Sequence, residues 1–581
     1  MRLPLGVLER LVGSFYGFSW FIALLFLRIV PLEVSAQGLS GRLVPRGSSD
    51  PINLPIRSLQ ARSLADNTTF GAGLADVSLT SDRQSYFTVI QAGNLNFRVN
   101  LDTASADLWL VSNNCSTNTC KAVPRYPLDH QSPTFGAVNN NATAFQAHYA
   151  DGTFASGFVA TETLQLANLT LANQELGVVT SSNVSLTDQS SGIMGLGFPR
   201  LSSIPSNATN SSSFFATLAS RGLLEYPIFA LSLTRNDTGT LSLGAIDSSV
   251  VSNASLIGWN KVAEFSPFGA ESNVSSYLQW AIQLSAIAVN GTQLLPIPTY
   301  PSSGQTRSLA LFDVGSPGVY GPFQDVSRIF AQVDGARLVD ENGIWAIPCD
   351  TTTPLSFTFG LRNYTLLPTD YIIGEAAGDP NLCLSWPMAL PPSSDGIDWQ
   401  IGTAFLRTVY SIFSFGIDGK EPPLIGLYPL FHQNSTNVTA ITQTPDIISS
   451  FLSANSEIIP TTLPNFVLST PTFTTPPYAL NTSVPASVGA IVSTGLANST
   501  YSALFGQKTT LANVSVLPVI TPQPSAVTVV VTNSAGSVST TVSVRTMAPL
   551  VLGLPSAGLS HRAPSYLSAL VMAAVPFIMF T

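Results

Sequence analysis

Short runs of hydrophobic residues alternate with polar turns through the middle of the chain. Residues 86–90 (YFTVI) form one run, and after the turn at residues 92–94 (AGN) the next begins at residues 97–99 (FRV). Runs of this kind, bounded by Gly, Asn, Ser and Pro, are typical of β-strands joined by tight turns. Segments with helical spacing are few and short. The pattern therefore predicts an all-β protein made of hairpins.

Two of the predicted strands end on an aspartate that is followed by a turn of small residues. Asp102 lies in residues 99–105 (VNLDTAS), and Asp313 lies in residues 309–316 (LALFDVGS). Burying a carboxylate is costly unless it is hydrogen-bonded or shares a proton. Because the same costly feature occurs twice, we expect two similar lobes that bring the two acids together.

The sequence after each aspartate supports the duplication. Gly195, in residues 191–197 (SGIMGLG), is 93 residues beyond Asp102, and Gly402, in residues 400–405 (QIGTAF), is 89 residues beyond Asp313. Each half thus contains an apolar strand ending in Asp, a long stretch of strands, and then an apolar-apolar-Gly segment. Such internal repetition decides the architecture of a chain.

At these residues the chain resembles the pepsin-like aspartic proteases, from about residue 86 to about residue 430. In that family each lobe supplies one Asp-Thr/Ser-Gly turn, which a later hydrophobic-hydrophobic-Gly segment surrounds. Further matches occur in the family's order at residues 106–110 (ADLWL), 148–153 (HYADGT), 345–350 (WAIPCD) and 405–410 (FLRTVY). The resemblance implies an all-β, bilobal pepsin-like fold with an active-site cleft between two similar lobes.

The resemblance also assigns roles to single residues. Asp102 and Asp313 are expected to form the catalytic pair, and residues 148–153 to form a flap hairpin that closes over a peptide. The expected supporting residues are Thr103, Ser105, Ser316, Tyr149 and Trp109. The expected substrate-binding residues are Tyr149, Asp151, Gly152 and Gly315.

Two facing carboxylates are sufficient for peptide hydrolysis. Like charges so close do not both ionise easily, so one proton is shared by the pair. The ionised acid takes a proton from a bound water, which attacks the carbonyl, while the protonated acid donates to the carbonyl oxygen. We therefore expect an aspartic endopeptidase active at acidic pH, with no metal and no cofactor.

Two positions depart from the family pattern. Ala104 stands where the family has Gly, which costs about 1 kcal/mol if φ is positive there and little if φ is negative. Val314 replaces a Thr or Ser whose hydroxyl bonds across the lobe junction, a loss of about 1 kcal/mol. Neither change removes a reacting group, so we favour an active enzyme. The alternative is an impaired pepsin-like protein that acts as a surface or cell-wall binding or adhesion glycoprotein.

Four cysteines allow three ways of pairing. The family's spacing favours Cys115 with Cys120 and Cys349 with Cys383, and an exported protein keeps such disulfides. Metal binding by these cysteines is a poor alternative, because the chain has only four histidines, none at ligand spacing from a cysteine.

Composition is typical of an exported glycoprotein. Charged residues make up only 10% of the chain, and Asn-x-Ser/Thr acceptor sites number about seventeen. The net charge of −9 argues against nucleic-acid binding, which favours a basic face. We expect peptide or protein substrates and a monomer. Residues 192–197 (GIMGLG) do not have the order of a dinucleotide-binding loop.

Both ends of the chain resemble targeting segments. Residues 1–36 are predicted to be a cleaved signal peptide, with a signal anchor as the alternative. Residues 556–581 have the order of a glycosylphosphatidylinositol (GPI) attachment signal, with an ordinary transmembrane helix as the alternative. The protein is therefore expected on the extracellular side of the plasma membrane or in the cell wall.

The remaining boundaries follow from changes in composition. Residues 37–80 are predicted to be a propeptide-like extension, 81–255 the first catalytic lobe and 256–430 the second. Residues 431–555 are rich in Ser, Thr and Pro and predict a low-complexity, glycosylated stalk. Within the stalk, residues 526–544 allow a β-hairpin as a minority interpretation.

Overall fold

The protein is described from a computed structural model. The described residues are 71–204, 213–235, 239–264, 277–299, 307–340, 343–376, 379–391, 396–417, 420–430, 443–454, 501–505, 517–522, 526–532, 538–544 and 552. The predicted signal peptide, most of the predicted extension and the predicted GPI signal lie outside them.

A sheet of 14 strands runs through the first lobe and beyond it. Across the sheet the strands are β13 (Gly258–Lys261), β27 (Leu424–Pro429), β26 (Val409–Ser414), β10 (Ile228–Ser232), β11 (Gly239–Leu243), β1 (Gly73–Leu79), β2 (Tyr86–Ala92), β3 (Leu95–Asp102), β9 (Ser190–Gly195), β4 (Leu108–Val111), β8 (Leu169–Ser182), β7 (Phe154–Leu166) and β5 (Gly136–Ala137), with β6 (Ala144–His148) paired to β7.

The second lobe contains a sheet of eight strands and a sheet of four. The larger consists of β21 (Arg362–Leu366), β20 (Leu355–Phe359), β14 (Ala281–Val289), β16 (Leu309–Phe312), β25 (Trp399–Ile401), β17 (Val319–Pro322) and β24 (Met388–Leu390), with β15 (Thr292–Leu294) paired to β14. The smaller consists of β18 (Arg337–Leu338), β19 (Trp345–Pro348), β23 (Asp379–Ser385) and β22 (Ile372–Ala376). Two further strand pairs are β12 (Ile246–Asp247) with β28 (Val519–Ile520), and β29 (Ala526–Thr532) with β30 (Val538–Val544).

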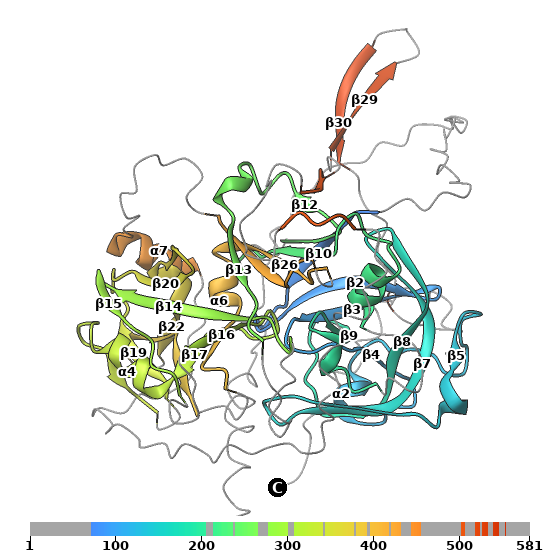
Figure 1. Cartoon of the computed structure of the whole chain (residues 1–581), viewed down its shortest axis with the longest axis horizontal. Coiled ribbons are helices and arrows are strands. Elements are labelled where there is room, and N and C mark those ends of the chain that lie inside the picture. The colour runs from blue at the N-terminus through green and yellow to red at the C-terminus, as the bar shows by residue number, and fades with distance from the viewer. Residues whose placement is uncertain are drawn as a thin grey trace, which may run out of the picture.

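The described helices are short and lie between strands. They are α2 (Asn118–Lys121), α3 (Phe214–Ser220), α4 (Phe323–Phe330), α5 (Pro368–Tyr371), α6 (Thr403–Leu406) and α7 (Pro445–Ala454), with 3-10 turns at η1 (Val138–Asn141), η2 (Pro199–Leu201) and η3 (Ala254–Leu256). Figure 1 shows the first lobe, in blue to teal, beside the second, in yellow. The predicted all-β, bilobal fold is confirmed.

The two lobes repeat one local arrangement around their aspartates. In the first lobe β9 is parallel to β3 and antiparallel to β4. In the second lobe β25 is likewise parallel to β16 and antiparallel to β17. The duplication inferred from the sequence is therefore a duplication of strand topology.

Side-chain alternation explains why β3 delivers an acid to the lobe junction. Phe97, Val99 and Leu101 are buried on one face of the strand, within the main hydrophobic core. Successive side chains of a strand point to opposite faces, so Asp102 lies on the face away from that core group. Strand and turn together therefore fix the direction of its carboxylate.

The lobes share a sheet rather than meeting only at a linker. Strand β26, from the predicted second lobe, pairs antiparallel with β10 of the first, and β27 and β13 continue the sheet. The sequence boundary predicted near residue 255 is thus not a boundary between sheets. The shared strands therefore join the two halves directly.

The folded body begins before the predicted boundary at residue 81. Strand β1 pairs with β11 through five residue pairs and also contacts β2, and Val77 is fully buried. These residues belong to the first lobe, not to the predicted extension at 37–80. The polar residues around β1 make this half-buried strand difficult to recognise in the sequence.

Parts of the predicted stalk pack on the body instead of leaving it. In α7, Ile448 is buried in the main core, as are Tyr501 and Phe505 further along the chain. The Phe505 N–H donates to the buried Glu421 carboxylate at 2.6 Å. These few apolar residues hold parts of an otherwise polar segment against the folded body. The hairpin β29–β30, the minority interpretation, does form, and it extends away from both lobes in Figure 1.

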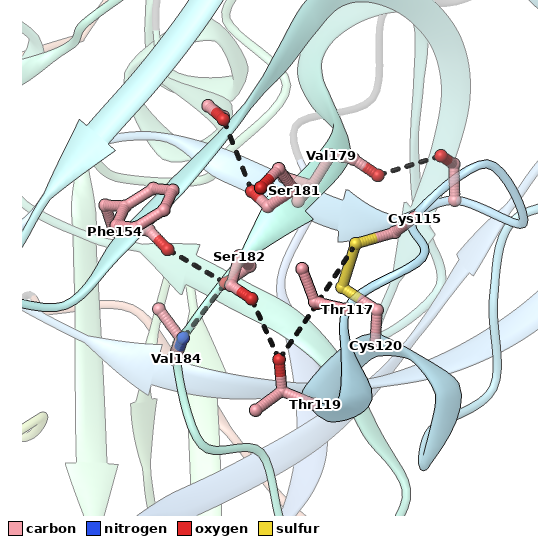
Figure 2. Close-up of a disulfide and its surroundings, with 11 residues drawn as sticks. Cys115, Thr117, Thr119, Cys120, Phe154, Val179, Ser181, Ser182 and Val184 are labelled. Carbon is pink, nitrogen blue, oxygen red and sulfur yellow. Dashed lines mark hydrogen bonds between the residues drawn. A yellow bond between two sulfur atoms is a disulfide. The ribbon is translucent and has the colours of Figure 1, made fainter.

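Both predicted disulfides are confirmed, as Cys115–Cys120 and Cys349–Cys383. Figure 2 shows the first one beside the end of β8. There the Thr119 hydroxyl donates to the Ser182 carbonyl, and the Ser182 hydroxyl donates to the Phe154 carbonyl, each at 2.9 Å. Since Phe154 begins β7 and pairs with His148, this chain of bonds ties the disulfide loop to the turn end of the β6–β7 hairpin.

Among the described residues, no helix has the length and apolar character needed to cross a membrane.

Candidate active site

Asp102 and Asp313 come together at the junction of the lobes. Both are buried, with 8% and 4% of their surface exposed. A methyl group placed on Gly315 would lie 2.9 Å from Asp102 Oδ1 and 3.1 Å from Asp313 Oδ1. The two carboxylates therefore converge on the same small space, which only a glycine leaves open.

The hydrogen bonds of the two acids match almost atom for atom. Asp102 Oδ1 accepts the Ala104 N–H at 2.8 Å, and Oδ2 accepts the Ser105 hydroxyl at 2.5 Å. In the second lobe, Asp313 Oδ1 accepts the Gly315 N–H at 2.8 Å and Oδ2 accepts the Ser316 hydroxyl at 2.6 Å. Ser105 and Ser316 thus lie where the sequence placed them, against the carboxylates.

The apolar-apolar-Gly segments enclose these turns as expected. The Leu196 N–H donates to the Asp102 carbonyl at 2.7 Å, and the Asp313 N–H donates to the Ile401 carbonyl at 3.0 Å. A Cβ at Gly195 would lie 2.4 Å from the Ala106 carbonyl carbon. A Cβ at Gly402 would lie 2.3 Å from the Ser316 carbonyl oxygen. Both glycines are required because another backbone approaches this closely.

The surroundings of Asp102 favour its protonated form. Burial is the largest cause that raises its pKa, to about 7, and the negative charge of Asp313 is the next. The hydrogen bonds from Ser105 and the Ala104 N–H act in the opposite direction. Burial and a neighbouring negative charge both disfavour the charged form of an acid.

Beneath the acids, Thr103 joins the lobes. Its hydroxyl donates to the Phe312 carbonyl at 2.8 Å and accepts the Val314 N–H at 3.0 Å. Thr103 and Val314 are both fully buried. The junction thus keeps the threonine's bonds on one side, while on the other the Val314 side chain has no hydroxyl to offer.

Ala104 fits its turn without backbone strain. It does not adopt a positive φ, and its N–H makes the bond to Asp102. The replacement of Gly by Ala at this position therefore has the small energetic cost expected for a negative φ. The side chain packs against a small apolar group formed by Ala281, Leu311 and Ile397.

The β6–β7 hairpin carries the predicted flap residues. The Trp109 indole N–H donates to the Tyr149 hydroxyl at 2.6 Å, which links the hairpin to β4. Burial raises the pKa of Tyr149, and the charge of Asp102 adds to the effect. Tyr149 therefore keeps its own proton available for donation near the acids.

Asp151 and Gly152 lie at the exposed tip of the hairpin. Asp151 Oδ1 accepts the Thr153 N–H at 2.8 Å and the Thr153 hydroxyl at 2.7 Å. Gly152 has φ +81°, a conformation that favours glycine. Both residues shape the turn, and their contact with substrate is a proposal.

One residue beside the acids was missed from the sequence. Gln400 donates its amide N–H to Asp313 Oδ2 at 2.7 Å. It was counted as part of an apolar-apolar-Gly segment, although it is polar. The repeat predicts an apolar residue at this position, so the presence of a polar one could have indicated a role for Gln400 in the site.

Comparison with known proteins agrees with this geometry. The family model for eukaryotic aspartyl proteases matches residues 85–419. The chain belongs to that family. It is accordingly an aspartic endopeptidase, a hydrolase whose substrates are peptides or proteins.

Individual relatives are distant but cover most of the body. An aspartic protease of Phaffia rhodozyma is 28% identical over 398 residues, which span 67% of this chain and 89% of the relative. The major aspartyl peptidase 1 of Cryptococcus neoformans is 26% identical, over 65% of this chain and 74% of the relative. Endothiapepsin of Cryphonectria parasitica is 26% identical, over 68% and 86%.

Proposed function

We propose that Asp102 and Asp313 are the catalytic pair of this endopeptidase and cleave peptide bonds through one activated water at acidic pH. The observation that carries the proposal is the convergence of two buried carboxylates on Gly315, each held by one backbone N–H and one serine hydroxyl. Neither acid is neutralised by a cationic side chain through any ion pair found in the described residues.

The pair divides the proton work. The ionised carboxylate removes a proton from the water as it attacks the carbonyl carbon, and the protonated one donates to the carbonyl oxygen. The resulting diol collapses when the nitrogen takes up the proton that the base removed from water and the C–N bond breaks, while a diol hydroxyl returns its proton to the other carboxylate. The hydrogen bonds from Ser105 and Ser316 fix the carboxylate planes, so little reorganisation is needed during reaction.

Substrate is expected to bind as an extended strand between the acids and the flap. Backbone hydrogen bonds of this kind give affinity, and side-chain pockets give specificity. Tyr149, Asp151, Gly152 and Gly315 are the proposed contacts. Tyr149 is held by Trp109, whereas Asp151 and Gly152 are exposed at the hairpin tip.

The proposed location is outside the cell, reached by the secretory route. A relative from Malassezia globosa bears the name secreted aspartyl protease 1 and is 25% identical over 60% of this chain. Two disulfides and the density of glycosylation sites agree with export. Attachment by a GPI anchor is proposed from the sequence of residues 556–581.

The test is peptide hydrolysis by the secreted protein across acidic pH. The expected result is cleavage that a hydroxyl-containing, transition-state-mimicking peptide inhibitor blocks at stoichiometric concentration. Binding of that inhibitor without cleavage of any peptide in a random library would instead favour the non-catalytic binding protein.

A further inference from the structure

Gln400 occupies a position that the duplication makes comparable between the lobes. In the middle of the second-lobe repeat it lies between Leu311 of β16 and Tyr320 of β17. It is two residues before Gly402, as Ile193 is two residues before Gly195 in β9. Ile193 is thus its counterpart, and there the side chain is apolar.

The Gln400 amide contacts the acid directly. Its Nε2 donates to Asp313 Oδ2 at 2.7 Å and to the Ser316 hydroxyl oxygen at 2.5 Å. The Ser316 hydroxyl itself donates to the same Oδ2. A carboxylate is an acceptor only, so the amide nitrogen, not its oxygen, suits an ionised Asp313.

This contact is the asymmetry in an otherwise symmetric pair. Asp102 and Asp313 each accept one backbone N–H and one serine hydroxyl. Asp313 accepts one donor more, and that donor has no equivalent at Ile193. Hydrogen bonds to the charged form of an acid favour that form.

We propose that Gln400 is a positioning residue that selects Asp313 as the ionised, water-activating member of the pair and leaves the shared proton on Asp102. This inference rests on the proposed function, since it assigns the two proton roles within the same site.

The other titratable groups around the acids agree with this assignment. Asp313 faces Asp102 across the junction and Tyr320 from β17, and the pKa of Tyr320 is raised first by burial and then by the charge of Asp313. Tyr149 faces Asp102 from the flap. Both tyrosines are neutral at acidic pH, so among the described residues Gln400 is the hydrogen-bond donor that distinguishes the two carboxylates.

The test compares Gln400→Met with the wild type in kcat/KM measured from pH 2 to pH 8. Methionine keeps the volume and removes the donor. Loss of a hydrogen bond to a charged group corresponds to about one pH unit. The acidic limb of the profile, which reports ionisation of the pair in the free enzyme, should therefore move up by about one unit.

Ile193→Met is the matched control, because it changes a side chain at the equivalent place without removing a donor. Its acidic limb should coincide with that of the wild type. If Gln400→Met lowers kcat while its acidic limb stays in place, or if both variants move the limb equally, the positioning role is overturned.

Gln400→Glu gives a second measurement should the methionine variant fail to fold. At low pH the introduced carboxylic acid is protonated and still donates to Asp313, so the acidic limb should be near that of the wild type. When the introduced group ionises it repels Asp313, so activity should be lost at a lower pH than in the wild type. A profile identical to wild type would contradict the proposal.

A readout independent of turnover separates this inference from the proposed function. In protein labelled with aspartate ¹³C-carboxyl groups, the pair is identified by the signal lost in Asp313→Asn, and its two apparent pKa values are followed by NMR. The lower one should rise by about one unit in Gln400→Met even if the wild type cleaves nothing. An unchanged lower value overturns the inference, whereas absent cleavage alone overturns only the proposed function.

Discussion

At the scale of single residues, we expect the protonation of Asp102 to set the alkaline limit of activity. Its pKa is raised to about 7 by burial and by the charge of Asp313. In the proposed mechanism the protonated form of Asp102 donates to the substrate carbonyl, so kcat/KM should fall as pH rises through about 7. A steady-state pH profile with an unfolding control measures this. Activity that stays constant to about pH 9 would contradict the role of Asp102.

Loss of the Thr103 hydroxyl should weaken the junction between the lobes. Its hydroxyl is fully buried and bonds the second lobe twice, as donor to Phe312 and acceptor from Val314. Thr103→Val keeps the shape but leaves a buried N–H without its partner, which costs about 1–3 kcal/mol of unfolding free energy. Urea unfolding measures the difference.

The opposite substitution is the matched comparison. By the pseudo-twofold relation, Val314→Thr places a hydroxyl where the first lobe already has one, and it should be neutral or stabilising by about 1 kcal/mol. Equal destabilisation by both substitutions would show that the buried hydroxyl at Thr103 carries no special stability.

The sequence predicted the positions of most residues around the two acids. Both aspartates, their serines and the two glycines of the later segments lie where the repeat placed them, because each sits at a strand end whose backbone the pattern fixes. Gln400 was missed because its neighbours made the segment look apolar. Asp151 accepts two hydrogen bonds from Thr153 within the turn, and its contact with substrate stays a prediction.

At the scale of elements, the β6–β7 hairpin should depend on one side-chain bond. Tyr149→Phe removes the oxygen that accepts the Trp109 indole N–H at 2.6 Å, and Trp109 is fully buried. The loss of one such bond, about 1.4 kcal/mol, corresponds to about tenfold in kcat/KM if the hairpin orders the substrate. Initial-rate kinetics with a peptide substrate measure this.

A substitution at the hairpin tip serves as a control, because it changes the turn without removing the bond between Tyr149 and Trp109. Gly152→Ala strains the turn because φ is +81° there. It causes no steric clash, since a Cβ at this position would meet nothing within 4 Å. It should affect kcat/KM less than Tyr149→Phe does. A Tyr149→Phe enzyme with wild-type kinetics would mean that the bond to Trp109 does not position the flap.

Element boundaries were the part of the fold that the sequence left least certain. Strand β1 was assigned to an extension because pairing with β11, from residues far along the chain, decides its burial. Tyr501 and Phe505 were assigned to a stalk for the same reason. Their burial depends on long-range partners such as Tyr226 and Trp259, which local composition does not reveal.

At the scale of the whole molecule, stability should be greatest in acid. Burial is the first cause that raises the pKa of six carboxyl groups: Asp102, Asp107, Asp325, Asp370, Asp398 and Glu421. A group whose pKa is raised on folding binds protons more tightly in the folded state, so its stabilisation is complete below about pH 4 and is lost as pH rises. The exposed Asp129, whose pKa is lowered, acts weakly in the opposite direction.

The urea concentration at the midpoint of unfolding should therefore decrease as the pH rises from about 4 to about 7. Asp102→Asn, which cannot ionise, should flatten part of that slope. A midpoint that rises steadily over the same range would show that the buried carboxyl groups are not held in their neutral form.

The most direct measurement of the whole account is peptide cleavage at acidic pH by Asp102→Asn and Asp313→Asn, each compared with the wild type and with Asp129→Asn, a change at an exposed carboxylate. Asparagine keeps the shape of either side chain but cannot exchange the proton. We predict that both dyad variants fold and lose at least about a thousandfold in kcat, while the control does not change. Near-wild-type cleavage by either dyad variant would contradict the pairing of these two acids as the catalytic centre.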